Sequence, residues 1–271
     1  MSYSDPNDIV VTIRRFIVKT NLVLKKIRSR EQTIGCFLGL GSPNVAELLA
    51  HSGFDWLVVE TEHNGLDSAE IEQMLTSINV TETIPIVRVP SSDKVYTQRA
   101  LDMGAMGVIV PMVKSAEEVS RIVQQTKYPP YGTRSWGPLR ASQYTIDNED
   151  YFEKANDNII VGIILETVDA LNDLENIISV PGLNVIVVGP WDLALSLGLD
   201  PRKLPLPEID EIVERVVHMT SATQVVVGSG SATPDGLKVL NNMGVRFLSY
   251  GPDYALLVNS AKIGLDVFSK L

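Results

Sequence analysis

The chain has 271 residues, of which 45% are hydrophobic and 21% charged, a balance that suits one large globular core. Its 33 acidic residues outnumber its 23 basic ones and give a net charge of -10, which argues against nucleic acid or anionic lipid as a partner. The single cysteine, Cys36, cannot form an internal disulfide, and no apolar run is long enough for a membrane span, so we expect a cytoplasmic protein.

The N-terminal segment differs in charge from the rest of the chain. Residues 9–30 carry seven basic side chains and no acidic one, interleaved with aliphatic residues. This composition is typical of a basic amphipathic helix, and a transit peptide has a similar one. We interpret residues 1–30 as a helical extension that covers the floor of the following domain or contacts another subunit.

From residue 31 onward, the chain alternates between short apolar runs and helix-like segments. Most of the runs are apolar throughout, as expected for parallel strands that are covered on both faces. Eight such units in a chain of this length predict an α/β protein with one (β/α)8 TIM barrel over residues 31–271. An open doubly wound sheet is the alternative, but the first loop does not match a glycine-rich phosphate loop. The predicted strands span residues 34–40, 56–60, 85–89, 107–111, 159–166, 185–189, 225–228 and 246–250.

Helix boundaries are marked by local signals between these strands. A hydroxyl residue before a proline predicts a helix start, and so does capping-box spacing between a short polar residue and a glutamate. Glycine after the last helical residue predicts a left-handed end. The starts are Ser42-Pro43, Thr233-Pro234, Asp67 with Glu70 and Ser115 with Glu118, and the ends are Gly53, Gly104, Gly182 and Gly244.

The longest interruption of the pattern lies between the fourth and fifth predicted strands, at residues 128–158. Its prolines and glycines exclude a long helix near its start, while its aromatic residues and Arg134 suggest ordered packing. We expect a structured lid or rim here, and no domain boundary.

Charged and polar residues follow several predicted strands at their C-terminal ends, where barrel enzymes place catalytic groups. Two carboxylates from adjacent strands, Glu166 and Asp192, repel each other unless a cation or proton lies between them. Without a histidine or cysteine of similar placement, they suit an oxygen-preferring ion such as Mg²⁺ or Mn²⁺. In the alternative, Glu166 pairs with an arginine and Asp192 caps the next helix. The whole set comprises Glu60, Glu62, His63, Arg88, Glu166 and Asp192.

Two further side chains suit chemistry at an electron-rich oxygen. Arg88 ends a buried strand, where it either pairs with a carboxylate such as Glu60 or stabilises an enolate oxygen. His63 lies beside two glutamates and could move a proton through a bound water. No lysine lies inside a predicted strand, and Lys114, the nearest, is expected to be solvated, which disfavours an imine mechanism.

With these residues in place, the sequence resembles the HpcH/HpaI family of metal-dependent (class II) pyruvate aldolases, within the phosphoenolpyruvate/pyruvate-binding barrels. The resemblance runs from about Asn21 to the C-terminus, and its motifs are specific in combination rather than singly. They occupy residues 53–63, 87–90, 101–105, 128–130, 132–134, 165–167 and 189–193.

The resemblance implies a role for each site residue. Glu166 and Asp192 would bind a divalent metal, with Mg²⁺ as the first expectation and Mn²⁺ or Co²⁺ as alternatives. Arg88 would hold the keto or enolate oxygen, and His63, with Glu60 close to it, would handle the proton of the aldol hydroxyl. The turn formed by Gly189, Trp191 and Asp192 would receive the carboxylate of a 2-keto acid.

The resemblance also implies an assembly. Members of the family tend to form hexamers with exchanged C-terminal helices, so residues 254–271 would pack on a neighbouring subunit. We therefore expect a homo-oligomer, a hexamer or trimer of dimers, whose partners are otherwise a small 2-keto acid and an aldehyde.

Three departures leave the second substrate open. Residues 60–63 read Glu-Thr-Glu-His where the family usually has Asp-Gly-Glu-His, and Ile164 replaces a usual glutamine. The segment 133–138 is nearer to that of macrophomate synthase. The sequence thus predicts an aldolase that cleaves or forms 4-hydroxy-2-keto acids through a pyruvate enolate. The alternatives are an oxaloacetate decarboxylase that uses the same enolate, and a non-catalytic barrel that binds keto acids.

Overall fold

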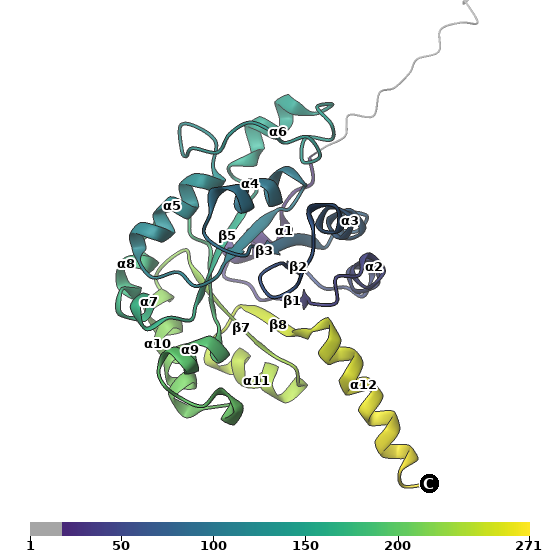
Figure 1. The fold of residues 1–271 in the computed structure, drawn as a ribbon. Helices are drawn as coiled ribbons and strands as arrows, with labels where there is room; N and C mark the ends of the chain where they lie inside the picture. Colours follow the sequence, from purple (N-terminus) through teal and green to yellow (C-terminus); the bar gives the residue numbers. More distant parts are fainter. Residues whose placement is uncertain (1–17) are drawn as a thin grey trace, which may run out of the picture.

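Eight parallel strands close into a barrel in the computed structural model, which describes residues 18–271 (Figure 1). Each strand pairs with the next one along the chain, and the last pairs with the first. The predicted (β/α)8 barrel is therefore confirmed, and every predicted strand is present with small shifts at its ends. The strands are β1 (Thr33–Leu38), β2 (Trp56–Glu60), β3 (Ile84–Arg88), β4 (Gly107–Val110), β5 (Ile160–Leu165), β6 (Val185–Val188), β7 (Val226–Ser231) and β8 (Phe247–Pro252).

The apolar strands separate two layers of core. One set of buried side chains fills the inside of the barrel, and the other lies between the strands and the surrounding helices. Inside, the rings of Trp56 and Phe247 stack with centroids 3.9 Å apart. Gly35 makes room for this pair, because a Cβ at that position would lie 2.0 Å from the Trp56 ring.

Helices surround the strands, and their predicted starts and ends are largely confirmed. Ser42 and Thr233 accept backbone hydrogen bonds as N-caps, and Asp67 forms the full capping box with Glu70. The helices that follow strands are α2 (Pro43–His51), α3 (Ser68–Asn79), α4 (Lys94–Asp102), α5 (Ala116–Thr126), α7 (Val168–Asn172), α8 (Leu174–Ile178), α9 (Pro190–Ser196), α10 (Pro207–Thr220), α11 (Pro234–Met243) and α12 (Asp253–Phe268), with a 3-10 turn at Pro201–Lys203.

One capping box is only half formed. Ser115 accepts a hydrogen bond from the Glu118 N–H, but the Glu118 carboxylate accepts from the Ser92 hydroxyl and the Lys114 N–H instead of returning to Ser115. The competing partners come from the loop after β3 and the loop after β4.

The four glycines predicted to end helices all have positive φ angles, between 89° and 101°.

Helix α1 (Leu22–Arg28) closes the N-terminal end of the barrel. Its Val23, Leu24 and Ile27 are buried in the inner core cluster, and the Asn21 side chain donates to the Met106 and Asn158 carbonyls. Helix α1 therefore covers the floor of the barrel. The start of the basic segment falls in residues 1–17, outside the described residues, and the division of the chain at residue 30 stays a prediction.

Residues 128–158 form an ordered cover on the outside of the barrel, with α6 (Asn148–Ala155) at its end. The buried Arg134 guanidinium donates to Asp102 at 2.6 Å and to the Tyr151 hydroxyl at 3.1 Å, and it lies 4.6 Å from the Tyr128 ring centroid. The expected ordered packing is thus present. Within one chain, however, the segment contributes no residue to the barrel mouth, so it is not a lid.

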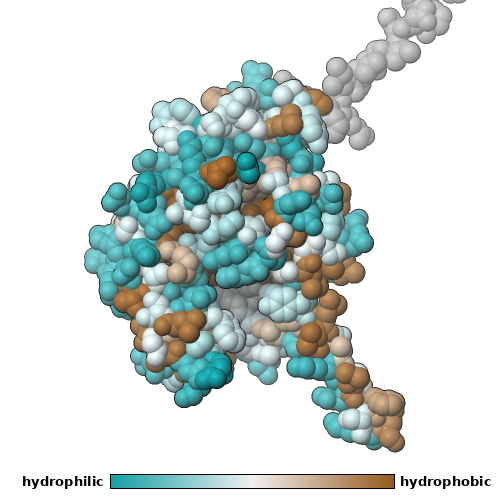
Figure 2. Space-filling view, in the orientation of Figure 1, coloured by the Kyte–Doolittle hydropathy of each residue, from teal (hydrophilic) through white to brown (hydrophobic). Residues whose placement is uncertain are grey.

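The C-terminal helix α12 extends away from the barrel (Figure 1). Most of its large apolar side chains are exposed, and Figure 2 shows them as hydrophobic surface along the projecting helix. Within residues 18–271, no helix combines the length and apolar character that crossing a membrane requires.

Candidate active site

A cavity of about 630 Å³ opens at the C-terminal ends of the strands. Its walls come from the ends of β1, β2, β3, β5, β6, β7 and β8 and from the loops that follow them. Every residue to which a role is assigned from the sequence lines this one cavity, although these residues are spread over 133 positions of the chain, from 60 to 192. They are Glu60, His63, Arg88, Glu166, Gly189, Trp191 and Asp192.

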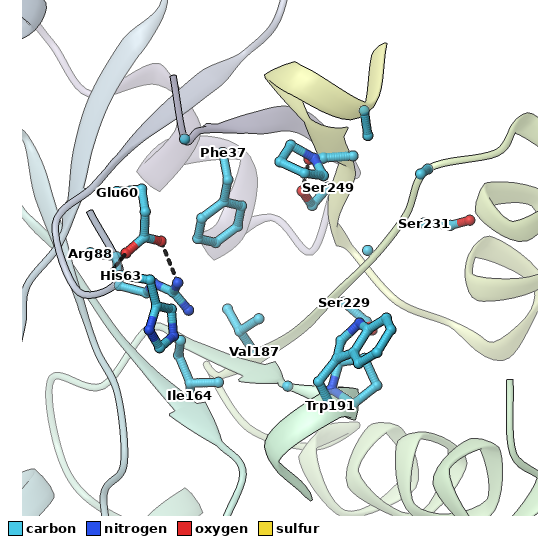
Figure 3. A pocket seen from close by; sticks show the side chains of 18 of the residues that line it. Phe37, Glu60, His63, Arg88, Ile164, Val187, Trp191, Ser229, Ser231 and Ser249 are labelled. Carbon is cyan, nitrogen blue, oxygen red and sulfur yellow. Dashed lines mark hydrogen bonds and ion pairs between the residues drawn. The ribbon is translucent and has the colours of Figure 1, made fainter. Parts of the chain in front are cut away.

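Glu60 and Arg88 form the corner between β2 and β3. They are register partners on the two strands, and their side chains form an ion pair, drawn as a dashed line in Figure 3. The other Glu60 oxygen accepts hydrogen bonds from the backbone N–H groups of Glu62, at 2.7 Å, and His63, at 3.2 Å. Glu60 therefore fixes both the guanidinium and the loop that carries His63. The alternative that Arg88 pairs with Glu60 is correct, and the pair lies within the site.

Glu62 belongs to the same corner, although we did not assign it a role from the sequence. Its Oε2 lies 3.3 Å from Arg88 Nη1 and 3.6 Å from His63 Nε2. That oxygen is buried and makes no hydrogen bond. Burial raises the pKa of the Glu62 carboxyl, and the nearby Arg88 and His63 oppose the shift. The signal available in the sequence was its position directly before His63.

Glu166 follows β5 and is almost fully buried. Its Oε1 accepts a hydrogen bond of 2.6 Å from the Met112 N–H, which the left-handed backbone of Met112 (φ 55°) helps to aim. Its Oε2 faces Gly189, where a Cβ would lie only 3.0 Å away. Glycine thus leaves space beside this oxygen.

The electrostatic surroundings of Glu166 are unfavourable to its ionised form. Burial raises the pKa of the Glu166 carboxyl to about 7, and the negative charges of Glu62 and Asp192 add to the shift. The Met112 N–H and the Arg88 guanidinium act in the opposite direction. In the absence of a further cation, a proton competes for this carboxylate near neutral pH.

Asp192 is the third residue of α9, one turn beyond the end of β6. Its carboxylate accepts no hydrogen bond from the α9 backbone in the described part of the chain, so the alternative that it caps this helix is not supported. Gly189 and Pro190 begin the helix and bring Asp192 to the cavity wall.

The charge balance of the cavity tests whether a metal ion fits. Glu62, Glu166 and Asp192 interact through space, and Arg88, already paired with Glu60, is the one guanidinium among the described residues that line the cavity. No group of three or more histidine, cysteine or acidic residues within 18–271 forms a complete metal site. Two carboxylates beside open space fit a hard divalent cation that keeps positions for water and substrate.

Fold and site together define a barrel enzyme with an acidic, arginine-containing mouth, and the comparisons with known proteins agree. Residues 33–260 match the family described as "HpcH/HpaI aldolase/citrate lyase". The 2-dehydro-3,6-dideoxy-6-sulfogluconate aldolase of Pseudomonas putida is 33% identical over 87% of this chain and 92% of its own length. The hydroxypyruvate/pyruvate aldolase of Paraburkholderia phytofirmans is 31% identical over 91% and 97%.

A solved structure of a family member also matches the fold of this chain. The HpcH/HpaI aldolase/citrate lyase family protein from Burkholderia cenocepacia superimposes with a TM-score of 0.86 at 30% identity, covering 92% of this chain and all of that one. The chain therefore belongs to the HpcH/HpaI aldolase/citrate lyase family. The expected family and lyase class are confirmed, and the names of the two relatives favour the aldolase over the oxaloacetate decarboxylase.

Proposed function

We propose that this protein is a class II, divalent-metal-dependent aldolase that cleaves and forms 4-hydroxy-2-keto acids, with pyruvate as the keto product. The observation that carries the proposal is the convergence of Glu166, Asp192, Arg88 and His63 on one cavity at the barrel mouth. Family membership supplies the reaction class, and the charge arrangement of the cavity supplies the reason for a metal.

Glu166 and Asp192 would hold the metal, with Mg²⁺ the first choice and Mn²⁺ or Co²⁺ as alternatives. When bound, such an ion supplies Lewis-acid polarisation of the keto group. The two carboxylates would hold it from adjacent strands, and Gly189 keeps the space at Glu166 Oε2 open. The turn at Gly189, Trp191 and Asp192 would receive the substrate carboxylate through backbone N–H groups.

Arg88 would donate to the keto oxygen of the substrate. During cleavage the bond between C3 and C4 breaks, and its electron pair moves to C3 and the C2 oxygen as an enolate. Arg88 stabilises that negative charge because its guanidinium is held at the cavity wall by Glu60 and Glu62. Protonation of C3 then gives pyruvate.

His63 would take the proton of the C4 hydroxyl through a water molecule, so that this carbon leaves as an aldehyde. Its imidazole is exposed to the cavity beside Arg88 (Figure 3), and Glu62 lies 3.6 Å from its Nε2. No lysine among the described residues lines the cavity, which supports this route over an imine.

We also propose a homo-oligomer, a hexamer or trimer of dimers, in the cytoplasm. The exposed apolar side chains of α12 support subunit contacts. Cys36 is a buried free thiol, which is compatible with a reducing compartment. Burial raises the pKa of this thiol to about 12.

The test is release of pyruvate from 4-hydroxy-2-keto acids, measured before and after treatment with EDTA and after addition of Mg²⁺, Mn²⁺ or Co²⁺. We expect loss with the chelator and recovery with metal in the wild type, and no recovery in Glu166→Gln. Turnover that survives the chelator, or a substrate adduct trapped by borohydride, would overturn the proposal.

A further inference from the structure

The cavity at the barrel mouth has two chemically different ends. Its charged lining residues gather at the end formed by β2, β3, β5 and β6. In Figure 3, Glu60, His63 and Arg88 lie together on one side, and Ser229, Ser231 and Ser249 lie across the cavity from them. Since the charged end would take the keto-acid half of the substrate, the far end would face the aldehyde half.

The far end has no positive side chain from residues 18–271 of the single chain. Among the described residues that line the whole cavity, Arg88 is the one permanent cation, and Glu60 and Glu62 already engage it. Lys238, on the helix that follows β7, pairs with Asp235 at 2.9 Å and does not line the cavity. A phosphate, sulfonate or second carboxylate on the aldehyde half would therefore meet no opposite charge.

The helix N-termini after β7 and β8 are also occupied, although barrels often bind phosphate at these positions. At α11, Pro234 has no N–H, the Thr233 hydroxyl accepts from the Gly236 N–H, and Asp235 adds a negative charge in the first turn. An anion would thus meet repulsion and few free donors there.

At α12, the buried Asp253 carboxylate fills the corresponding place. Its Oδ1 accepts from the N–H groups of Gly39, at 2.9 Å, and Tyr254, at 2.8 Å, and its Oδ2 accepts from the Leu40 N–H at 3.2 Å. These N–H groups already donate to the Asp253 carboxylate, so they are not available to bind an anionic group at the end of a substrate.

Two serine hydroxyls of the far end, those of Ser249 and Ser229, are better suited to neutral hydroxyl groups than to anions. Ser249 donates to the Gly251 carbonyl at 3.2 Å, and the Ser229 hydroxyl lies 3.5 Å from the Val188 carbonyl. With their protons directed to the protein, these oxygens can accept hydrogen bonds but have little to donate. A substrate hydroxyl can donate to them, whereas an anion cannot.

We propose that the aldehyde half of the substrate is a short, uncharged hydroxyaldehyde, so that the full substrate is a hydroxylated 2-keto acid with one anionic end. This rests on the proposed aldolase function and narrows its substrate class. It sets the chain apart from its Pseudomonas putida relative, whose name specifies a sulfonated substrate.

The test compares three six-carbon 4-hydroxy-2-keto acids that differ only at carbon 6, which carries a hydroxyl, a phosphate or a sulfonate. Both C4 epimers of each are assayed with the Mg²⁺-loaded, full-length enzyme. We expect kcat/KM for the hydroxyl compound to exceed the other two by about 100-fold, because the anions lose solvation without gaining a partner. The variant Ala232→Arg, at the far wall, should raise the relative kcat/KM for the phosphate compound.

Exchange of pyruvate methyl protons with deuterium, followed by NMR with the same enzyme, separates the two levels of the claim. Equal or better cleavage of a charged compound would overturn the substrate class and leave the aldolase function standing. Metal-dependent exchange of the pyruvate protons without cleavage of any of the three compounds would also overturn the substrate class and leave the aldolase function standing. Absence of both exchange and cleavage would overturn the aldolase function itself.

Discussion

At the residue scale, the corner formed by Glu60, Glu62 and Arg88 explains how three charges can share a partly buried site. Glu60 is satisfied by Arg88 and by two backbone N–H groups, so it serves mainly to hold the corner in place. Glu62 has a buried oxygen without a hydrogen bond, between the imidazole and the guanidinium. Of the two glutamates in this corner, Glu62 is therefore the one whose charge would act on His63 in the proposed reaction.

Replacing Glu62 by glutamine tests that role. Glu62→Gln keeps the shape but removes the negative charge that faces His63 Nε2 at 3.6 Å and would stabilise the positive charge that develops as His63 takes the proton. We therefore expect kcat to fall by roughly 100-fold with little change in KM. The pH profile of kcat should shift as well, which a purely structural role would not cause. The matched control is Glu211→Gln on the exposed face of α10, and an equal loss of kcat there would contradict the assignment.

Glu166 provides a prediction for stability. Its pKa in the folded protein, about 7, lies above its ordinary value of 4.5. Its contribution to stability is therefore full below pH 4.5 and is lost as the pH rises through 7. In metal-free protein, Glu166→Gln should increase the free energy of unfolding at pH 8 by roughly 2 kcal/mol and change it little at pH 5. Urea unfolding in the presence of EDTA measures these free energies. If Glu166→Gln increased the free energy of unfolding equally at pH 5 and pH 8, burial of the ionised carboxylate would not be the cause.

At the element scale, the strands and most helix ends could be predicted because their determinants are local. Uniformly apolar runs mark strands covered on both faces, and Pro43 or Gly244 mark helix boundaries through their own backbone preferences. The contacts that complete the site are not local. The Met112 N–H reaches Glu166 across 54 positions, and Glu118 leaves its capping box for Ser92, 26 positions away. No pattern within either segment encodes such partners.

Packing inside the barrel gives a prediction at the same scale. A methyl group at Gly35 would overlap the ring of Trp56, which stacks on Phe247 and cannot move freely. We expect Gly35→Ala to lower the free energy of unfolding by about 3 kcal/mol. Gly65→Ala, where a Cβ meets no atom within 4 Å, should change it by less than about 0.5 kcal/mol. Similar urea midpoints for the two variants would show that the inner core tolerates the added group.

At the scale of the whole molecule, the barrel could be predicted from the repeat of eight units, and so could the convergence of site residues at one mouth. The packing of α1 into the floor follows from its apolar residues. The position of residues 128–158 on the barrel could not be predicted from the sequence, because prolines and aromatic residues indicate order but do not specify which surface the segment covers. The Arg134 contact with Asp102, which fixes the segment to the end of α4, joins residues 32 positions apart.

The projecting helix α12 gives the prediction for assembly. Leu265 is 66% exposed in the single chain, and covering such residues in a subunit contact would remove apolar surface from water. Leu265→Asp should shift the protein to smaller species in sedimentation velocity. Ser260→Asp, which adds the same charge at an exposed polar position of this helix, should not. A wild-type protein that sediments as a monomer at micromolar concentration would contradict the proposed oligomer.

The most direct measurement of the central claim is the binding of Mn²⁺ to the protein, followed by paramagnetic relaxation of water protons at pH 6 and pH 8. Two carboxylates at the barrel mouth should bind one ion per chain, and more weakly at pH 6, because a proton competes for Glu166. We predict that Asp192→Asn and Glu166→Gln each abolish this binding while Glu211→Gln preserves it. Undiminished Mn²⁺ binding in both site variants would contradict the account.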